Sequence, residues 1–376
     1  MKQKKPYDRK EPFNHLPLLP PEEHKIWSEK VLKILAKTSR SLGKLDGMTA
    51  TLPNPEMLVN NIFLQEAKSS SEIENIFTTE DELYKALSNT TTEEKANTAT
   101  KEVLRYREAL WSGLNSLKEE GEIKTTTIIE IYQKIKQTKQ TIRTPQSRTV
   151  IRKSGSSLTS GDVVYTPPRG EKIIEEKLDN LITFINDDEQ YPIDPLIKMI
   201  LSHYQFEAIH PFTDGNGRTG RILNLLLLFQ KNLLTHPILY LSKYIIQHKA
   251  DYYHCISGVT QRADWESWIL FMLEAVDQTT NYTITVIEAI TLQMRDTYTY
   301  TKDKLPFFNK EMLEVMFTQP YIKRKIIGEI AGTKSRTTST KYMKELCRIG
   351  VLTEKREGRE VYYVNHDLIN ILSGKA

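Results

Sequence analysis

The sequence has little of what would tie a fold together covalently or place it in a membrane. Its 376 residues include only two cysteines, Cys255 and Cys347, which lie far apart and lack the spacing of metal ligands. A disulfide framework and a zinc cluster are therefore excluded as the basis of the fold. No uncharged apolar run approaches the roughly 20 residues that a membrane helix needs, and no apolar segment of a signal peptide follows the polar start MKQKKPYDRKEPF. We expect a soluble, cytoplasmic protein without a membrane partner.

The sequence also lacks a strong net charge, since the formal total is +4. The charge is uneven, however: residues 306–376 hold 13 Lys and Arg against 8 Asp and Glu, and residues 1–305 are nearly neutral. A basic C-terminal segment favours an acidic partner, although such a surplus is often only solvated surface. With 39% hydrophobic residues, the chain is long enough for two or three domains with apolar cores.

Prolines divide the chain into stretches whose apolar residues recur at every third or fourth position, which is typical of amphipathic helices. We expect helices over residues 24–45, 57–77, 91–114, 126–136, 171–187, 194–209 and 217–234. The last contains RILNLLLLFQ, which is apolar nearly all round and indicates the buried central helix of a bundle. Between these helices, RTVIRKSGSSLTSGDVVYTPPRG at 148–170 alternates β-branched residues around a Ser/Gly-rich centre and predicts a β-hairpin. The fold class is therefore mainly α.

The segment HPFTDGNGRTGR, His210 to Arg221, carries the chemistry. Asp214 to Gly217 is a turn sequence directly before a helix, and glycines let backbone N–H groups converge on an anion. The first helical turn adds unsatisfied N–H groups and the positive end of the helix dipole, which suit a phosphate. Arg218 and Arg221 share one face of that turn and can both reach one polyphosphate. Asp214 can hold a divalent cation, and His210 is the natural general base near neutral pH.

Two familiar phosphate-binding motifs do not fit this segment. Gly215, Gly217 and Gly220 satisfy G-x-G-x-x-G, but the preceding residues SHYQFEAI are helical and no acid that could hold a ribose occurs between Asp214 and Asp251. A P-loop needs Lys and Ser or Thr after its glycines, whereas arginine follows Gly217. A glycine-rich helix start with surface arginines and no further role is the remaining structural interpretation.

The pattern H-P-F-x-D-G-N-G-R-x-x-R resembles the signature of Fic-domain proteins. Its fixed positions are filled here by His210, Pro211, Phe212, Asp214, Gly215, Asn216, Gly217, Arg218 and Arg221. The resemblance covers about residues 55–275, including the hairpin, which is similar to the flap of the family, and LYLSKYIIQHKADYYHCI, which is similar to its downstream helices. It implies a Fic-type helical bundle around the motif helix, with the hairpin as a flap.

The resemblance implies adenylylation, the transfer of AMP from ATP to a Tyr, Thr or Ser hydroxyl of target proteins and of the protein itself. His210 would take the proton of the acceptor hydroxyl, and Asp214 would bind Mg²⁺, or Mn²⁺ in its place, against the phosphates. The ATP contacts would come from Gly215, Asn216, Gly217, Arg218, Thr219, Gly220 and Arg221, with Asn216 also reaching the α-phosphate and the arginines holding the distal phosphates.

Two further sets of residues have expected roles from the same resemblance. Val163, Val164 and Tyr165 in the flap would hold the target segment by strand addition. Tyr252 and Tyr253 fall where the family lines its adenine pocket, although a helical Tyr pair is more often core or surface.

A second motif lies upstream. Ser70, Glu74 and Asn75 fill the pattern [ST]-x-x-x-E-[GN], which resembles the inhibitory motif of the family. Ser70 and Glu74 are four residues apart and would share a helix face. The resemblance implies that Glu74 pairs with Arg221 and displaces the γ-phosphate, because a bidentate carboxylate occupies the arginine fork that the phosphate needs. Its place before the core suggests the class of the family in which the inhibitory helix is N-terminal.

The last seventy residues predict three helices and a hairpin turning at Glu357 and Gly358, which is the order of a winged helix. Cations on the third helix and the wing could contact DNA phosphates: Lys334, Arg336, Lys341, Lys344, Lys355, Arg356 and Arg359. Protein contact by this module is the alternative. The expected domains are 1–110 with the inhibitory helix near 57–77, the Fic core at 111–280, a helical linker at 281–305 and the winged helix at 306–376.

Three functions remain open at this stage. The first is the protein adenylyltransferase restrained by Glu74. The second is a DNA-binding regulator whose Fic core senses nucleotide, but such a sensor would not need His210. The third keeps the enzyme and changes the group that is moved, or removes AMP. Apolar helical surfaces make a homodimer reasonable, and the target protein cannot be read from the sequence.

Overall fold

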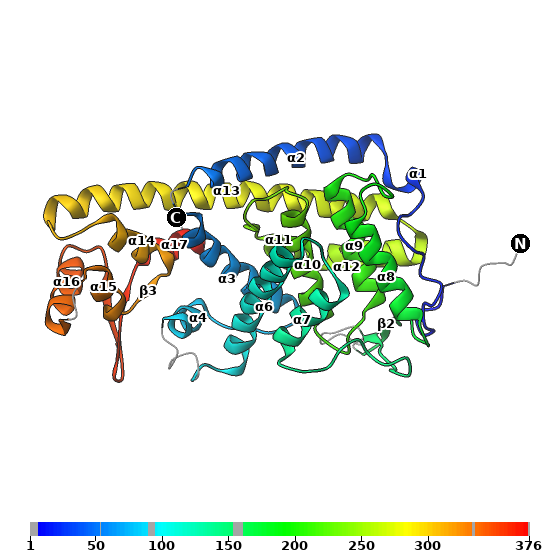
Figure 1. Cartoon of the computed structure of the whole chain (residues 1–376), viewed down its shortest axis with the longest axis horizontal. Coiled ribbons are helices and arrows are strands. Elements are labelled where there is room, and N and C mark those ends of the chain that lie inside the picture. The colour runs from blue at the N-terminus through cyan, green and yellow to red at the C-terminus, as the bar shows by residue number, and fades with distance from the viewer. Residues whose placement is uncertain (1–6, 53, 89–94, 153–160, 333–334, 375–376) are drawn as a thin grey trace, which may run out of the picture. The chain divides into compact units, whose positions relative to one another are not determined.

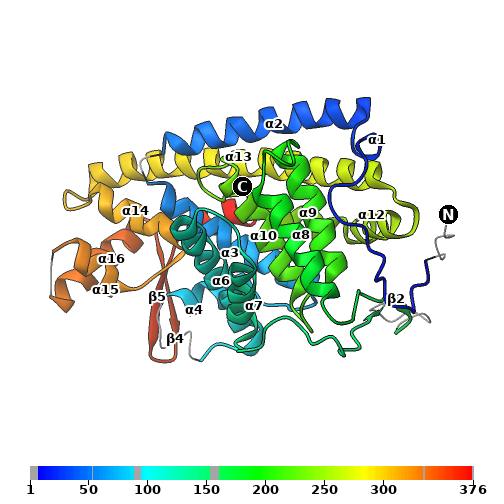
Figure 2. The same cartoon turned by 45° about the vertical axis from the view of Figure 1, so that its right-hand side comes forward.

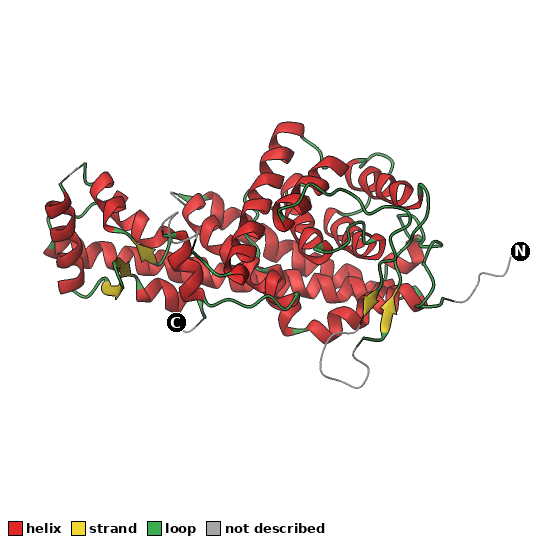
Figure 3. Ribbon diagram, turned by 90° about the horizontal axis from the view of Figure 1, so that it is seen from below, coloured by secondary structure: helices red, strands yellow, loops and turns green. Residues whose placement is uncertain are grey.

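The computed structural model describes residues 7–52, 54–88, 95–152, 161–332 and 335–374, and within these it is mainly helical (Figures 1 and 3). It contains two compact units, one made of residues 1–46, 105–237 and 241–278, the other of residues 47–104, 238–240 and 279–376. The expected mainly α fold is confirmed. The helices are α1 Glu23–Ile26, α2 Glu29–Ala50, α3 Pro55–Ile73, α4 Glu80–Leu87, α6 Thr98–Glu120, α7 Thr125–Lys136, α8 Ile173–Asn186, α9 Pro195–Ile209, α10 Asn216–Gln230, α11 Leu241–Gln247, α12 Lys249–Arg262, α13 Trp265–Lys304, α14 Lys310–Thr318, α15 Arg324–Ile330, α16 Arg336–Arg348 and α17 His366–Leu372.

The first unit is built around α9 and α10, which pack against each other with α7 and α8 beside them (Figure 2). Nearly every residue of α9 and α10 is buried, as the apolar sequence of α10 predicted. Close packing requires a glycine on a neighbouring helix: a Cβ at Gly113 of α6 would lie 3.0 Å from both Ile131 Cδ1 and Leu226 Cδ1. The motif loop that joins α9 to α10 is therefore anchored between two largely buried helices.

Two helix starts differ from the sequence prediction because side-chain caps fix them. The expected helix from residue 24 is broken at Trp27, which is extended, and Ser28 Oγ accepts the N–H of Val31 at 3.2 Å to begin α2. Residues 91–94 of the helix expected from residue 91 lie outside the described residues. In the part that follows, the helix begins at Thr98, and Asn97 Oδ1 accepts the N–H of Thr100 at 2.8 Å. Ser and Asn are favoured N-cap residues, so both starts could have been found in the sequence.

Two helix ends also come earlier than expected. The helix expected over 57–77 ends at Ile73, and the helix expected over 217–234 ends at Gln230. Asn75 and Asn232 follow these ends with φ of 62° and 54°. A residue in this left-handed region stops a helix, and asparagine tolerates the region better than most residues do.

The hairpin of the first unit has two short strands, β1 Ile151–Arg152 and β2 Val163–Tyr165, paired antiparallel (Figure 3). Ile151 stands opposite Tyr165 and Arg152 opposite Val163, with an irregularity between them. The Ser/Gly-rich centre at 153–160 lies outside the described residues.

The C-terminal elements of the second unit follow the predicted order of three helices and a hairpin. The helices are α14, α15 and α16, and the hairpin is β4 Thr353–Glu357 with β5 Glu360–Val364, turning at Gly358 with φ of 58°. Two elements were missed. The two-residue strand β3, Tyr321–Ile322, pairs with β5 and gives the sheet order β3-β5-β4, and α17 follows β5. Both are short, so they leave little periodic signal.

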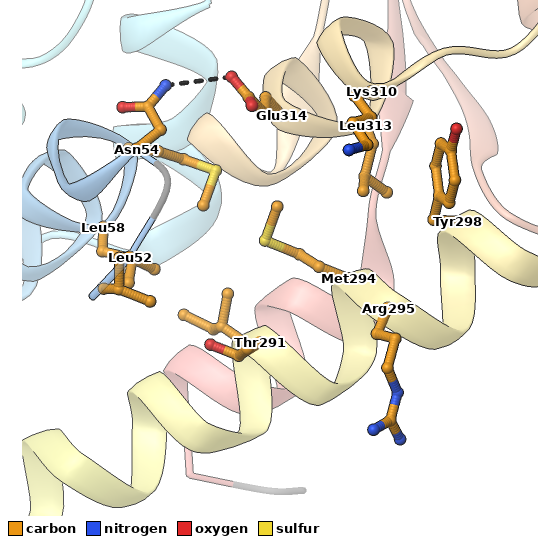
Figure 4. Close-up of a pocket in the computed structure, with 12 residues that line it drawn as sticks. Leu52, Asn54, Leu58, Thr291, Met294, Arg295, Tyr298, Lys310, Leu313 and Glu314 are labelled. Atoms are coloured by element: carbon orange, nitrogen blue, oxygen red, sulfur yellow. Dashed lines mark hydrogen bonds between the residues drawn. The ribbon is translucent and has the colours of Figure 1, made fainter. Parts of the chain in front are cut away.

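The second unit also holds a mainly apolar pocket of about 290 Å³ between the start of α3, the later part of α13 and α14 (Figure 4). Met57, Leu58, Met294 and Leu313 are among its lining side chains, and none of the lining residues belongs to the motif segment. The side-chain amide of Asn54 donates to Glu314 Oε2 at 3.2 Å at one side of the pocket.

No helix within the described residues is both long and apolar enough to cross a membrane.

Candidate functional site

The loop from His210 to Gly215 is held by the side chain of Asn216. Asn216 Oδ1 accepts the N–H of Phe212 and its Nδ2 donates to Phe212 O, both at 2.9 Å. Asn216 is buried, and the Phe212 ring stacks on Tyr132 of α7 with 4.0 Å between ring centroids. This side chain fixes the loop that carries His210 and Asp214, a role that the sequence alone did not indicate.

His210 ends α9 in the left-handed region, with φ of 51° and its N–H bonded to Phe206 O at 3.0 Å. This conformation turns the chain away from the helix axis directly after a buried helix. The side chain is half-buried. A general base needs this combination of a fixed backbone and access to substrate.

The start of α10 follows a glycine turn, as the sequence predicted. Gly215 precedes the helix with φ of 77°, where a side chain would be strained, and a Cβ there would lie 3.3 Å from the Lys136 stem. Within the described residues no side chain caps this helix start. The backbone N–H groups of its first turn and the helix dipole therefore suit an anionic ligand.

Thr219 and Gly220, expected among the ATP contacts, have structural roles in this turn. The Thr219 hydroxyl donates to Gly215 O at 2.9 Å and the side chain is fully buried. A Cβ at Gly220 would lie 2.6 Å from Glu207 Oε1 and 2.9 Å from Phe206 Cδ1, so this glycine lets α10 approach α9. Arg218 and Arg221 lie on the same helix and are both 2% exposed.

Asp214 is the acidic group of the loop, and Lys136 Nζ lies 2.6 Å from its Oδ2. Burial raises the pKa of Asp214, but the Lys136 hydrogen bond and the Gly215 N–H outweigh it and hold the pKa below its usual value. The carboxylate is 68% exposed. Mg²⁺ commonly uses one or two carboxylates together with substrate phosphates and waters, so one exposed carboxylate beside the uncapped start of α10 fits that ion. No cluster of three or more His, Cys, Asp or Glu side chains suited to a metal occurs among the described residues.

Arg143 is a site residue that sequence analysis missed. Its Nε donates to His210 O at 2.8 Å, and its Nη2 donates to Ile209 O at 3.1 Å and to Pro168 O at 2.5 Å. Burial lowers the pKa of this guanidinium to about 10. Arg143 thus neutralises the carbonyl end of α9 and ties His210 to the chain that leaves the flap. No local pattern around Arg143 indicated these contacts, which bring together residues far apart in sequence.

The three flap residues expected to dock a target have different surroundings. Tyr165 is buried, and its hydroxyl donates to Ala208 O at 2.8 Å. Val163 is half-buried and Val164 is 38% exposed. Tyr165 therefore anchors the strand to α9, and Val164 is the side chain most available to a partner.

Tyr252 and Tyr253 also have different surroundings. Tyr252 is 2% exposed, and its hydroxyl lies 2.8 Å from His203 Nε2. His203 stacks on Trp268, and burial together with the charge of Arg221 lowers its pKa to about 3. Tyr253 is 47% exposed. Of the pair, only Tyr253 presents a ring to solvent.

The upstream motif, in the second unit, forms a helix end with a defined geometry. The N–H of Ile76 bonds Ser71 O and the N–H of Asn75 bonds Glu72 O, both at 3.0 Å, and Asn75 is left-handed. These two bonds make a Schellman motif with Glu74 as the C-cap. Ser70 is fully buried and Glu74 half-buried. Glu74 therefore stands at the C-cap of α3, four residues after Ser70, and not inside a helix that continues to residue 77.

Three family models match successive parts of the chain. Residues 32–115 match the Fic/DOC family N-terminal model, residues 122–228 match the Fic/DOC family model, and residues 293–368 match the C-terminal domain model of the SoFic-like protein adenylyltransferases. The second range contains the motif segment. The chain therefore belongs to the Fic/DOC family.

Two similar proteins are named protein adenylyltransferases. The protein adenylyltransferase fic-1 of Caenorhabditis elegans is 31% identical over 112 residues, which are 30% of this chain and 20% of the relative. The protein adenylyltransferase Fic of Drosophila mojavensis is 29% identical over 96 residues, 26% of this chain and 18% of the relative. The matched residues thus span about a fifth of the length of each of these relatives.

Two solved structures share the fold. A Fic family protein from Desulfovibrio desulfuricans G20 aligns with a TM-score of 0.57 and 16% identity over 92% of this chain and 98% of that chain. Fic-1 of C. elegans aligns with a TM-score of 0.52 and 22% identity over 68% of this chain and 72% of that chain. The expected Fic-type fold is confirmed by these alignments.

Proposed function

We propose that this protein is an adenylyltransferase, which transfers AMP from ATP to a hydroxyl side chain of target proteins and of itself. The observation that carries the proposal is the complete set on one loop and helix start: His210 at a turned helix end, Asp214 exposed, and an uncapped first turn of α10 with two arginines behind it. The names of the similar proteins, protein adenylyltransferase fic-1 and protein adenylyltransferase Fic, support the same reaction.

Each step of the reaction has a residue for it. The nucleotide phosphates bind the N–H groups of the first turn of α10, with Arg218 and Arg221 neutralising the distal phosphates. His210 accepts the proton of the attacking hydroxyl as that oxygen bonds to the α-phosphorus. The bond from the α-phosphorus to the bridging oxygen breaks, and pyrophosphate leaves with the electron pair. Positioning and charge neutralisation supply most of the catalysis in such a transfer.

Asp214 would hold a divalent cation. Bound there, Mg²⁺ or Mn²⁺ would neutralise negative charge on the phosphates. Lys136 holds the carboxylate in place at 2.6 Å and keeps it ionised.

Glu74 is proposed as the inhibitor of this activity. A carboxylate that occupies an arginine fork excludes the phosphate that the fork would bind. The Schellman motif supports this role because it places Glu74 at a fixed helix end instead of on a solvated helix face.

The experiment compares protein incubated with ATP labelled at the α- or the γ-phosphate. We expect the α-label alone to become protein-bound, with transfer rising at least about tenfold in Glu74→Ala because the arginine fork is released. Glu72→Ala is the matched control, since Glu72 lies two residues away and pairs with Lys68 at 3.4 Å. Transfer of the γ-label would contradict AMP as the moved group, and equal activity of the Glu74 and Glu72 variants would contradict autoinhibition.

DNA binding is the weaker proposal because two of the cations expected to contact DNA are paired with carboxylates, and a third, Lys334, lies outside the described residues. On the wing, Lys355 pairs with Asp81 at 2.6 Å and Arg356 with Glu354 at 2.5 Å. The remaining basic face lies on α16, where Arg336, Lys341 and Lys344 line a shallow hollow together with Glu345. The winged-helix assignment, DNA or protein contact through it, and a homodimer remain proposals.

A further inference from the structure

The clearest unexplained cluster of charges lies in the second unit, between α4 and the β4–β5 hairpin (Figure 2). Asp81 of α4 accepts hydrogen bonds from Lys355 Nζ at 2.6 Å and from the hydroxyl of Tyr321. Lys85, one turn later, pairs with Asp81 and with Glu357, both at 2.5 Å. Five groups from α4, β3 and β4 therefore form one continuous network.

The carboxylate of Asp81 has several hydrogen-bond partners in this network. Burial raises the pKa of Asp81, but the hydrogen bonds from Lys355, Lys85 and Tyr321 outweigh it and lower the pKa to about 2. The Tyr84 ring, also on α4, stacks on Tyr321 with 6.1 Å between centroids. Networks of several charges with ring contacts hold a geometry better than isolated surface pairs do.

α4 is tied in turn to the helix that ends at Glu74. The Tyr84 hydroxyl accepts a hydrogen bond from Gln65 Nε2 of α3 at 2.9 Å. Lys68 of α3 lies 3.7 Å from Glu80 at the start of α4. Only residues 75–79 separate Glu74 from α4, and a capping box between Thr79 and Glu82 fixes the first turn of α4. Displacement of α4 would therefore pull directly on the turn that carries Glu74.

We propose that Asp81, Lys355 and Tyr321 are positioning residues, through which the C-terminal sheet holds α4 and so keeps Glu74 in its inhibitory place. The inference rests on the proposed function of Glu74 and adds what controls it. A partner that takes Lys355 and Glu357 away from α4 would raise AMP transfer without touching the nucleotide site. An acidic partner suits Lys355, since it would replace the carboxylate of Asp81.

The neighbouring strand residue supplies a matched control. Lys355 and Arg356 are adjacent on β4, and successive side chains of a strand point to opposite faces. Lys355 reaches α4, whereas Arg356 pairs with Glu354 of its own strand. Lys355→Met and Arg356→Met remove the same charge from the same strand.

The experiment measures AMP transfer together with amide hydrogen exchange of residues 70–88. We expect Lys355→Met and Asp81→Asn to raise transfer about fivefold, at the low end of typical couplings between sites, and to speed exchange over residues 70–88. Arg356→Met should leave both readouts unchanged, and Lys355→Arg should retain the parent behaviour. In a Glu74→Ala background, Lys355→Met should not raise AMP transfer further, because the carboxylate that Lys355 helps to position is absent.

Three results would overturn the inference: unchanged exchange in both Lys355→Met and Asp81→Asn, faster exchange without a rise in transfer while Glu74→Ala is active, or an equal effect of Arg356→Met. If neither the parent nor Glu74→Ala transfers AMP, the proposed function fails. Exchange at residues 70–88 would then still show whether Lys355 holds this segment.

Discussion

His210 and Asn75 share a backbone conformation that few residues other than glycine adopt, with φ of 51° and 62°. Each follows a mostly buried helix, and each turn places a proposed functional group at the end of the helix axis: the His210 imidazole itself, and the Glu74 carboxylate beside Asn75. His and Asn are among the residues enriched in this region. The spacing of the motifs indicated which residues act, but the reason for the Asn75 position appears only in the hydrogen bonds of the turn.

His203 provides a prediction at the same scale. Its pKa is lowered to about 3 by burial and the charge of Arg221, whereas a histidine in the unfolded chain titrates near 6.5. Between pH 6.5 and pH 3 the unfolded chain therefore binds a proton at His203 that the folded protein does not bind. The contribution of His203 to the free energy of unfolding is fully present above pH 6.5 and is lost as the pH falls toward 3.

Between pH 7 and pH 5 we expect His203 to contribute a loss of about 2 kcal/mol in the free energy of unfolding. Urea titrations at both pH values measure the loss. In His203→Gln, whose amide can still bond Tyr252, the loss should be smaller by that amount. An identical loss in parent and variant would show that His203 protonates in the folded state.

At the scale of elements, the helices with long apolar periods were predictable, and α9 lies within one residue of its expected bounds. Boundaries failed where a single Ser or Asn decided them, as Ser28 and Asn97 do at the starts of α2 and α6. The Asn216 side chain and the Arg143 guanidinium could not have been placed from sequence, since their partners are backbone atoms brought close only by the fold.

The end of α3 gives the prediction at this scale. Asn75→Gly should leave stability nearly unchanged, because glycine is the preferred residue at this position of a Schellman motif. Asn75→Val should cost about 1–3 kcal/mol, since a β-branched residue is strained in the left-handed region.

Thermal unfolding of the two variants compares these costs, and the AMP-transfer assay reports whether Glu74 is still held. We expect Asn75→Val to transfer AMP faster than Asn75→Gly. Equal stability of the two variants would contradict the Schellman geometry that assigns Glu74 to the helix end.

At the scale of the whole molecule, two compact units carry the two proposed functions. The motif loop and the flap belong to the unit that contains residues 105–237, and the segment of Glu74, α4 and the C-terminal sheet belong to the other. The proposed transfer site and the proposed regulatory segment therefore lie in different units. The Fic/DOC model at 122–228 falls in the first of these units and the C-terminal model at 293–368 in the second, whereas the N-terminal model at 32–115 includes residues of both.

The most direct test of the central claim is intact-protein and peptide mass spectrometry of the Glu74→Ala protein after incubation with ATP and a divalent cation. The account predicts a mass increase of one AMP unit on a hydroxyl side chain, and none in Glu74→Ala combined with His210→Ala. An unchanged mass of the Glu74→Ala protein and of every protein in an added lysate, or equal modification without His210, would contradict it.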